Sequence, residues 1–280
     1  MRTTSLAFAK LNLFLAVHGR REDGFHEIES IVQTIDLADR IEVDVRPGTG
    51  IVVENTLADI PGPDLAERAA ATCLAVKEVS LHVEIRIQKG IPAGAGLGGG
   101  SSDAAAVLQS LDRLVPPRLG DEELRRLAAG IGSDVPLFLV GGCVRITGRG
   151  EVVERLPGTR RERFVVVVPP MRCPTADVYG AWAAHRPPRP GTASALGSND
   201  LLAPALVVRP QLRRYEEVVA RGGGLYSGMS GSGSSFYVAF SNENQADACA
   251  RELRAALPES AVFDCAPTSA GMALLEGEDV

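Results

Sequence analysis

The chain has 280 residues, 45% of them hydrophobic and 23% charged, and its formal net charge at pH 7 is −6. This composition is ordinary for a globular protein with a large buried core, and it excludes the broad basic surface that nucleic-acid binding requires. Residues 1–17 are largely apolar, but Lys10 and Asn12 interrupt them, so we expect neither a membrane span nor a cleaved leader. The five cysteines lack zinc-site spacing, which favours reduced thiols in a cytoplasmic protein.

Residues 6–17 alternate in the way that predicts a β-strand. The odd-numbered positions from Ala7 to Val17 are all apolar and are expected to form one face. The opposite face then carries Lys10 and Asn12 side by side. An inward-facing lysine among phenylalanines is unusual. A lysine that protects an edge strand from aggregation is an equally good interpretation of this segment.

The middle of the chain predicts strands and helices in alternation. After a polar loop at 18–27 and a strand region at 28–45, we expect a helix at 65–76 with Asp64 as its N-cap. Residues 81–88 alternate as a half-exposed antiparallel strand. The remaining elements expected before residue 157 are a helix after the glycine-rich stretch 91–103, a helix at 121–129 and a hairpin that ends near 156.

Charged and turn-forming residues cluster at 157–163, and we place a domain boundary there, with domains at 1–157 and 158–280. Beyond it the sequence predicts further strands and helices, which completes an α+β pattern. These elements are, in chain order, a strand at 164–168, a mobile surface loop at 187–198, helices within 199–220, a glycine-rich turn at 225–235, a strand at 236–240, a helix at 245–257 and a final strand pair.

The stretch 91–103 is nearly free of side chains and opens a helix that ends before Pro116. Glycine lets backbone N–H groups approach an anion closely, and a helix N-terminus adds unpaired donors and a positive dipole end. The stretch therefore predicts a phosphate-binding loop. The residues of this loop are Pro92, Ala93, Gly94, Ala95, Gly96, Leu97, Gly98, Gly99, Gly100, Ser101 and Ser102.

Two common nucleotide-binding loops fit this stretch poorly. A GxGxxG pattern is present, but a dinucleotide-binding loop needs a buried parallel strand before it and an acidic residue at the end of the next strand. Here the preceding strand is amphipathic, and the acidic residues at the right distance begin a helix at Asp121. A P-loop needs Lys before its Ser or Thr, and Gly100 stands there instead. A turn without function is disfavoured, because so many glycines lose much conformational entropy on folding.

The loop resembles the phosphate loop of the GHMP kinases, the family of galactokinase, homoserine kinase and mevalonate kinase. Four further segments are similar to one branch of this family in order and rough spacing. That branch phosphorylates a cytidine diphosphate-linked polyol in the non-mevalonate isoprenoid pathway. The matching segments extend over nearly the whole chain and are AKLNLFL at 9–15, DGFHE at 23–27, GSDVPLF at 132–138 and SGMSGSGSS at 227–235.

This resemblance implies a two-domain α+β fold with the active site in the cleft between the domains. The γ-phosphoryl group of ATP, bound with Mg²⁺ at the loop, would move to the 2-hydroxyl of the substrate. The family's catalytic pair would be Lys10 and Asp134. No carboxylate is distinguished as a metal ligand, and Ser102 is a candidate. The substrate-binding residues implied are Asn12, Phe25, His26, Thr175 and Tyr179.

The chemistry of these residue types agrees with such a reaction. Phosphoryl transfer depends on positioning and charge neutralisation more than on covalent chemistry. Asp134 can accept the proton of the substrate hydroxyl, and the ammonium of Lys10 can keep that carboxylate ionised. An aromatic ring at Phe25 can stack on a base, while His26 can form a directional hydrogen bond to the base edge.

Each residue also has a plain structural interpretation. Asp134 precedes Val135 and Pro136 and therefore suits a helix N-cap. His26 can be an ordinary loop histidine, and Tyr179 a core aromatic residue. The glycine-flanked Ser232 can line the cleft or simply belong to a tight turn.

Three other functions remain open from the sequence. The first is a GHMP kinase for another small alcohol, such as homoserine or mevalonate, which the DGFH segment disfavours. The second is a non-catalytic nucleotide-binding protein of the same fold, which the presence of both Lys10 and Asp134 disfavours. The third, an NAD-dependent oxidoreductase, is supported by GxGxxG alone. We expect ATP and a small-molecule substrate as partners, with no nucleic acid and no membrane.

Overall fold

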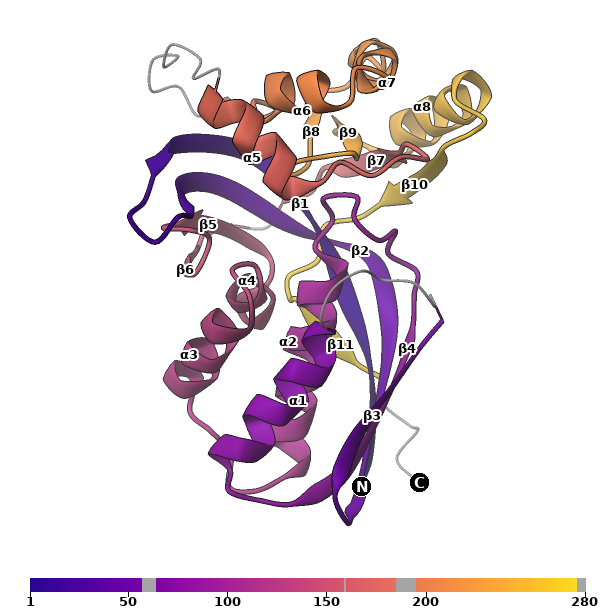
Figure 1. The fold of residues 1–280 in the computed structure, drawn as a ribbon. Helices are drawn as coiled ribbons and strands as arrows, with labels where there is room; N and C mark the ends of the chain where they lie inside the picture. Colours follow the sequence, from indigo (N-terminus) through magenta and orange to yellow (C-terminus); the bar gives the residue numbers. More distant parts are fainter. Residues whose placement is uncertain (57–63, 159, 185–194, 276–280) are drawn as a thin grey trace.

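The strands of the chain form two β-sheets, each accompanied by helices (Figure 1). The computed structural model describes residues 1–56, 64–158, 160–184 and 195–275. The first sheet has seven strands, in the order β11-β1-β2-β4-β3 with β5 paired to β2 and β6 paired to β5. The second sheet has four strands, in the order β10-β7-β9-β8. The predicted α+β class is confirmed.

The predicted helix at 65–76 and the predicted strand at 81–88 are confirmed with the same bounds. The strands are β1 (Arg2–Arg20), β2 (His26–Pro47), β3 (Gly50–Asn55), β4 (Leu81–Gln88), β5 (Cys143–Thr147), β6 (Val152–Arg155), β7 (Arg163–Val168), β8 (Tyr226–Met229), β9 (Phe236–Phe240), β10 (Ala261–Cys265) and β11 (Met272–Leu274). The helices are α1 (Leu65–Val76), α2 (Gly99–Leu114), α3 (Asp121–Ile131), α4 (Val135–Val140), α5 (Thr175–Ala184), α6 (Leu202–Val208), α7 (Leu212–Ala220) and α8 (Glu243–Ala256).

The long strands β1 and β2 form the centre of the first sheet. They pair antiparallel along nearly their whole length, from Arg2 opposite Asp44 to Arg20 opposite His26. On its other side β2 pairs antiparallel with β4, and β4 in turn pairs parallel with β3. The prediction that β4 is an antiparallel strand is therefore correct for only one of its two edges.

The odd-numbered residues of β1 do not form the single apolar face that the alternation predicts. Ala7, Leu15 and Val17 belong to one hydrophobic core. The odd positions between them, from Ala9 to Leu13, belong to a second core. The pairing with β2 is irregular at Phe8/Ala9 and at Asn12/Phe14. Such irregularities bend and twist a strand, which explains why its middle faces a different core from its ends.

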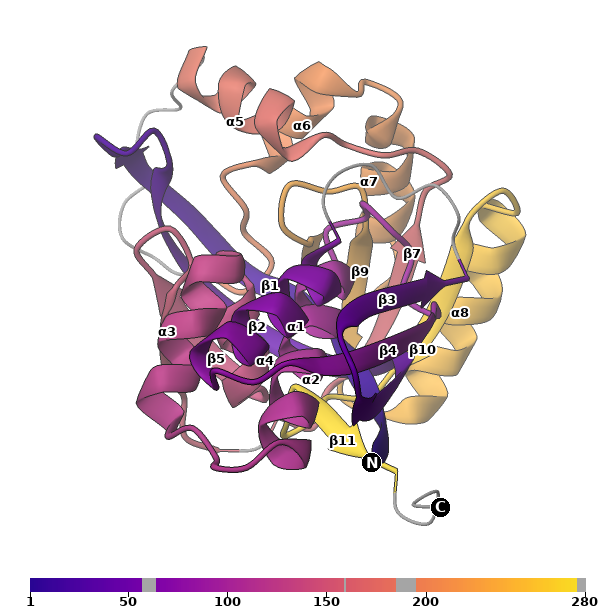
Figure 2. The same ribbon diagram turned by 60° about the horizontal axis from the view of Figure 1, so that its bottom comes forward.

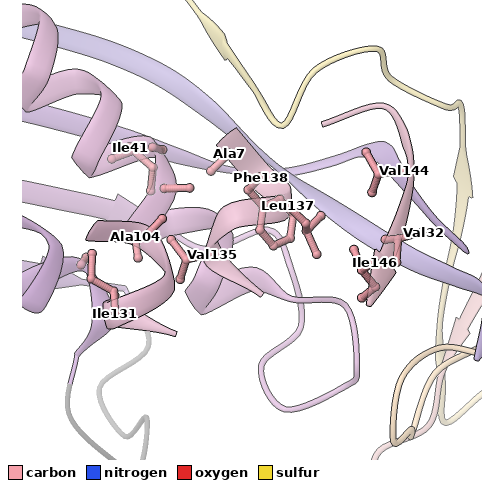
Figure 3. Close-up of a cluster of buried hydrophobic side chains, with 14 of the residues drawn as sticks. Ala7, Val32, Ile41, Ala104, Ile131, Val135, Leu137, Phe138, Val144 and Ile146 are labelled. Atoms are coloured by element: carbon pink, nitrogen blue, oxygen red, sulfur yellow. The ribbon is translucent and has the colours of Figure 1, made fainter. Parts of the chain in front are cut away.

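One part of the first core packs the seven-stranded sheet against α1–α4 (Figure 3), and the rest of it lies in the second half of the chain, where Val165 and Val238 are members. Ile41 of β2, Ala104 of α2 and Phe138 of α4 are all buried there. Full burial of an aliphatic or phenyl side chain contributes roughly 1.5–3 kcal/mol. Packing of this core therefore fixes α2 and α4 relative to β1, and these elements carry most of the site described below.

The second core lies between the two sheets. Leu11 and Leu13 of β1 meet Val166 of β7 and Tyr237 of β9 in one buried cluster. The Tyr237 hydroxyl also donates a hydrogen bond of 3.1 Å to the carbonyl oxygen of Asn12. The middle of β1 is therefore held by side chains from both halves of the chain.

The chain passes from the first sheet to the second between Arg155 and Arg163. Both strands predicted at the end of the chain are present, but they do not pair with each other: β10 pairs with β7, whereas β11 returns to the first sheet and pairs with β1. Figure 2 shows β11 beside the N-terminus. We propose to keep the domains as 1–157 and 158–280, with β11 as a strand that the second domain contributes to the first sheet.

Three smaller expectations concern local features. The Asp64 side chain accepts a hydrogen bond of 2.8 Å from Ala66 N–H, so the predicted N-cap of α1 is confirmed. Most of the loop expected at 187–198 lies outside the described residues. In the part of the chain that the structure describes, no helix combines the length and apolar character needed to cross a bilayer.

Candidate active site

A cavity of about 1110 Å³ is lined by residues from both halves of the chain. Ser102 is absent from its lining, whereas Ser101 is present. Every other residue predicted for the site contributes to the wall. These residues are Lys10, Asn12, Phe25, His26, Asp134, Thr175 and Tyr179, together with the loop residues 92–101.

The glycine-rich loop contributes backbone to the cavity, because side chains cannot be accommodated at key positions. Gly96 has φ +79°, and a Cβ there would lie 2.3 Å from the Ser230 carbonyl oxygen. Gly98 has φ +76°, and a Cβ there would lie 2.8 Å from the Phe138 ring. Gly98 is also the N-cap of α2 and supplies no side-chain cap. The N–H groups of the first turn of α2 therefore remain available for an anion.

Ser102 is directed away from the cavity. Its hydroxyl is buried and donates a hydrogen bond of 2.7 Å to the Phe8 carbonyl oxygen. Its backbone N–H donates to Gly98 within the helix. Ser102 thus fastens α2 to β1 and is a poor candidate for a metal ligand.

Lys10 and Asn12 lie together inside the protein, as the alternation predicts. The ammonium of Lys10 donates a hydrogen bond of 2.5 Å to Asn12 Oδ1. Asn12 Nδ2 donates to the Ser30 hydroxyl at 2.9 Å, and this hydroxyl donates to the Phe14 carbonyl, which fixes the orientation of the Asn12 amide. Lys10 is only 4% exposed. This burial excludes the alternative that Lys10 protects an exposed strand edge.

Asp134 directly precedes α4, but its side chain does not cap this helix. The carboxylate lines the cavity instead, as does the ammonium of Lys10. Burial lowers the pKa of Lys10, and the negative charge of Asp134 acts in the opposite direction. The structure therefore brings together two residues that lie far apart in the sequence, close enough for one charge to affect the other.

His26, Tyr179 and Trp182 form an aromatic group, of which His26 and Tyr179 line the cavity. The His26 ring stacks on Tyr179 with centroids 4.8 Å apart, and the Trp182 ring lies at 87° to the His26 ring with centroids 5.4 Å apart. His26 Nε2 is buried and has no hydrogen-bond partner among the described residues. Burial, and secondly the charge of Arg20, lowers the pKa of His26. A neutral imidazole with a free ring nitrogen can bind one polar atom of a ligand.

Phe25 and Thr175 also line the cavity. Phe25 is 48% exposed, and the Arg149 guanidinium lies 5.0 Å from the centre of its ring. The Thr175 hydroxyl lies 3.0 Å from that of Ser232, so one donates to the other. Ser232 also lines the cavity, which decides between the two interpretations of its glycine-rich turn.

Comparison with known proteins identifies the family. The model of the GHMP kinases N-terminal domain matches residues 64–142, and that of the GHMP kinases C-terminal domain matches 183–259. A 4-diphosphocytidyl-2-C-methyl-D-erythritol kinase from Desulfitobacterium hafniense is 37% identical over 258 residues, or 86% of this chain and 88% of its own. The enzyme of that name from Thiobacillus denitrificans is also 37% identical, with 90% of each chain covered. The chain belongs to the GHMP kinase family.

Solved structures agree with this assignment. A crystal structure of 4-(cytidine 5′-diphospho)-2C-methyl-D-erythritol kinase has a TM-score of 0.76 and 34% identity, and the match covers 95% of this chain and 99% of the other. A homoserine kinase from Cytophaga hutchinsonii has a TM-score of 0.73 at 17% identity, over 98% and 97% of the two chains, and shows the same fold. The predicted two-domain GHMP kinase fold is confirmed, and the protein is a phosphotransferase of this family.

This GHMP kinase has a buried cluster of charged side chains at the start of its phosphate loop. The sequence did not reveal this cluster. The ammonium of Lys89, which lines the cavity, lies 2.5 Å from an Asp39 oxygen and 2.7 Å from an Asp103 oxygen. Asp39 also accepts hydrogen bonds from the N–H groups of Gly90 and Ile91. The cluster therefore fixes the start of the loop to β2 and α2. The one sequence indication is that Lys89 directly precedes the loop.

Two arginines in the cavity wall were also missed. Arg20 ends β1, and Arg149 lies in the turn between β5 and β6. Arg149 donates a hydrogen bond of 3.0 Å to the Ala129 carbonyl oxygen, which places its guanidinium above Phe25. A Cβ on the neighbouring Gly150 would lie 3.6 Å from Asp134 Oδ1, so this turn lies close to the carboxylate. The GHMP kinase cavity is thus more basic than its predicted residues suggest.

Proposed function

We propose that this GHMP kinase transfers the γ-phosphoryl group of ATP to the 2-hydroxyl of 4-diphosphocytidyl-2-C-methyl-D-erythritol in the non-mevalonate isoprenoid pathway. The names of the relatives support this substrate. The observation that carries the proposal is the single cavity that joins a glycine loop, a Lys–Asp pair and an aromatic group. Its volume of about 1110 Å³ exceeds the roughly 300–1,000 Å³ of most small-molecule sites, as expected for a site that holds two ligands.

The ATP phosphates would bind to the backbone of residues 92–102 and the N-terminus of α2. No lysine or arginine occurs in this segment, so backbone N–H groups and the helix dipole supply the local attraction. Mg²⁺ would accompany ATP and take most of its ligands from phosphate and water. Asp134 is the one acidic residue in the cavity wall that the structure describes, and Ser101 can add a hydroxyl. Mg²⁺ would supply further neutralisation of phosphate charge.

Asp134 would act as the general base and Lys10 as the charge stabiliser. The carboxylate of Asp134 is not used to cap α4, so it can accept the proton of the substrate hydroxyl. Lys10, which donates to Asn12, would be held beside the reacting atoms and offset the charge on the attacking oxygen. Burial makes this interaction stronger than it would be in water.

The cytidine end of the substrate would bind at the aromatic group. Phe25 and Tyr179 would stack on the cytosine ring, and His26 would use its unpartnered Nε2 for the base edge. Thr175 and Asn12 would contact the rest of the substrate. Arg20 and Arg149 also line the cavity and suit the diphosphate, because one guanidinium group can form two parallel hydrogen bonds to phosphate oxygens.

The cytoplasm is the proposed compartment. All five cysteines are free thiols, which suits a reducing environment. ATP and the cytidine diphosphate-linked polyol are the proposed partners.

The identity of the substrate is tested by measuring ADP release with different phosphoryl acceptors. The purified enzyme is supplied with ATP and Mg²⁺ and with the cytidyl polyol, homoserine or mevalonate, and reactions without acceptor give the background. We expect turnover of the cytidyl polyol alone, with phosphorus NMR showing a new phosphate ester on its 2-hydroxyl. Turnover of homoserine or mevalonate without the cytidyl polyol would contradict the proposal.

A further inference from the structure

Asn199 binds the second glycine-rich turn through its side chain. It precedes α6, and its Nδ2 donates hydrogen bonds of 2.8 Å to the carbonyl oxygens of both Met229 and Gly231. Its Oδ1 accepts a hydrogen bond of 2.8 Å from Leu201 N–H. One side chain therefore holds both carbonyl groups that flank Ser230 and also caps the turn that leads into α6.

The backbone around Asn199 is fastened to β1, the strand that carries Lys10. Leu15 N–H donates to the Ser198 carbonyl at 3.0 Å, and Asp200 N–H donates to the Leu15 carbonyl at 2.9 Å. The Asp200 carboxylate accepts a further hydrogen bond of 2.9 Å from Val17 N–H. The backbone that carries the Asn199 amide is therefore fixed relative to β1 and to Lys10.

The turn that Asn199 holds touches the reacting part of the cavity. A Cβ at Gly231 would lie 3.3 Å from the Lys10 ammonium and 3.5 Å from Asn12 Oδ1. The fully buried Ser230 donates a hydrogen bond of 2.8 Å to the Gly96 carbonyl of the phosphate loop and accepts one of 3.2 Å from Asn12 N–H. A displacement of this turn would therefore reach both Lys10 and the loop.

We propose that Asn199 is a positioning residue for phosphoryl transfer, which holds the turn at 229–231 through two of its carbonyl groups and so keeps Gly231 beside Lys10. This inference rests on the proposed function, in which Lys10 stabilises charge in the transition state. The two N–H donors of the amide are the essential feature, since an aspartate of the same size has none. Misplacement of a reacting group by about 1 Å can lower a rate by about 100-fold.

The substitution Asn199→Asp separates positioning from local folding. It keeps the acceptor for Leu201 N–H and places a carboxylate oxygen opposite the two carbonyl oxygens. We expect kcat to fall by about tenfold or more, while the two lost hydrogen bonds lower the melting temperature by only a few degrees and leave the protein folded. Asn242→Asp is the matched control, because Asn242 also accepts a backbone hydrogen bond, from Gln245 at 3.0 Å, at the start of α8. If Asn199→Asp gives insoluble protein, Asn199→Ser is measured instead, since serine also lacks the amide donors.

A double-mutant cycle with Lys10→Ala decides whether Asn199 acts through Lys10. We expect Asn199→Asp to lower kcat in the parent enzyme and to have little further effect once Lys10 is alanine, because coupled residues are not additive. An equal fold-loss in both backgrounds, or no loss in the parent enzyme, would overturn the inference. Lys10→Ala without effect on kcat would instead contradict the proposed function, so the two failures are distinguishable.

Discussion

Lys10 and Asp134 come from opposite ends of the first domain and line one cavity, where the carboxylate opposes the effect of burial on the pKa of the ammonium. Burial alone favours a neutral lysine. The nearby carboxylate, together with the hydrogen bond to Asn12, favours the charged form that a phosphoryl-transfer site needs. Asp134 therefore supports the protonated state that the proposed mechanism requires of Lys10.

Removal of the Lys10 charge is expected to lower catalysis more than binding. In Lys10→Ala we expect kcat to fall by about 100-fold or more, because the lost interaction is strongest when charge develops. The KM for ATP should change only a few-fold, since the loop backbone remains. Steady-state kinetics test this. Lys10→Met, which keeps most of the side-chain volume, separates loss of charge from loss of packing. A raised KM at unchanged kcat would show that Lys10 only binds a ligand.

The aromatic residues that line the cavity are expected to determine binding of the cytidyl substrate. His26→Ala should raise the KM for this substrate by about tenfold, the effect of roughly 1.4 kcal/mol from one hydrogen bond to a base. The KM for ATP should stay the same. Tyr215→Phe is a suitable control, because the Tyr215 hydroxyl in α7 donates a hydrogen bond to Glu259 and Tyr215 does not line the cavity. An unaltered substrate KM in His26→Ala would remove His26 from the binding site.

A side chain at Gly96 should disrupt the phosphate loop. Its Cβ would lie 2.3 Å from the Ser230 carbonyl oxygen, at a φ of +79°. We expect Gly96→Ala to cost about 1–2 kcal/mol of unfolding free energy from backbone strain alone, and to raise the KM for ATP by about tenfold or more. Gly130→Ala in α3 is the matched control, because nothing lies within 4 Å of its Cβ position. It should add about 0.5–1 kcal/mol of stability without changing the kinetics. Equal effects of both substitutions would refute the steric argument.

The pKa of His26 tests how burial and the charge of Arg20 act on this side chain. Burial lowers it from the ordinary value of 6.5, and Arg20 lowers it further. The unfolded chain therefore binds more protons than the folded one between the lowered value and 6.5. The stability contributed by neutral His26 is consequently lost as the pH falls through this range.

Substitution of Arg20 should remove the smaller of the two effects that lower the pKa of His26, which is the positive charge of Arg20. In Arg20→Gln we expect NMR titration to give a higher His26 pKa, still below 6.5 because burial persists. Arg21→Gln is the control, since Arg21 pairs with Asp23 and Glu27 instead. A His26 pKa that stays the same or falls in Arg20→Gln would disprove the assigned cause.

The parts of the fold that depend on local pattern could be predicted from the sequence. The alternation at 81–88 and the cap at Asp64 act within a few residues, and both were predicted correctly. The division of β1 between two cores depends on irregular pairing with β2. The place of β11 depends on a partner strand at the other end of the chain. Neither property is contained in the local pattern.

The candidate site also combines features that local sequence predicts with features that depend on how distant segments pack. The glycine loop and the Lys10–Asn12 pair follow from local spacing, since both lie within one segment. The Lys89–Asp39–Asp103 cluster joins β2, the end of β4 and α2, and so depends on how these elements pack. The roles of Lys10, Asp134 and the aromatic residues come from the family resemblance and stay predictions.

The most direct test of the account is the rate of phosphoryl transfer in Asp134→Asn, measured in a single turnover with enzyme in excess over the cytidyl substrate. Asparagine has the same shape as aspartate and cannot serve as the base. Asp177→Asn, on the exposed surface of α5, is the control. We predict that Asp134→Asn binds both ligands within a few-fold of the parent enzyme and transfers phosphate at least about 100-fold more slowly. Transfer at the parental rate would contradict the central claim.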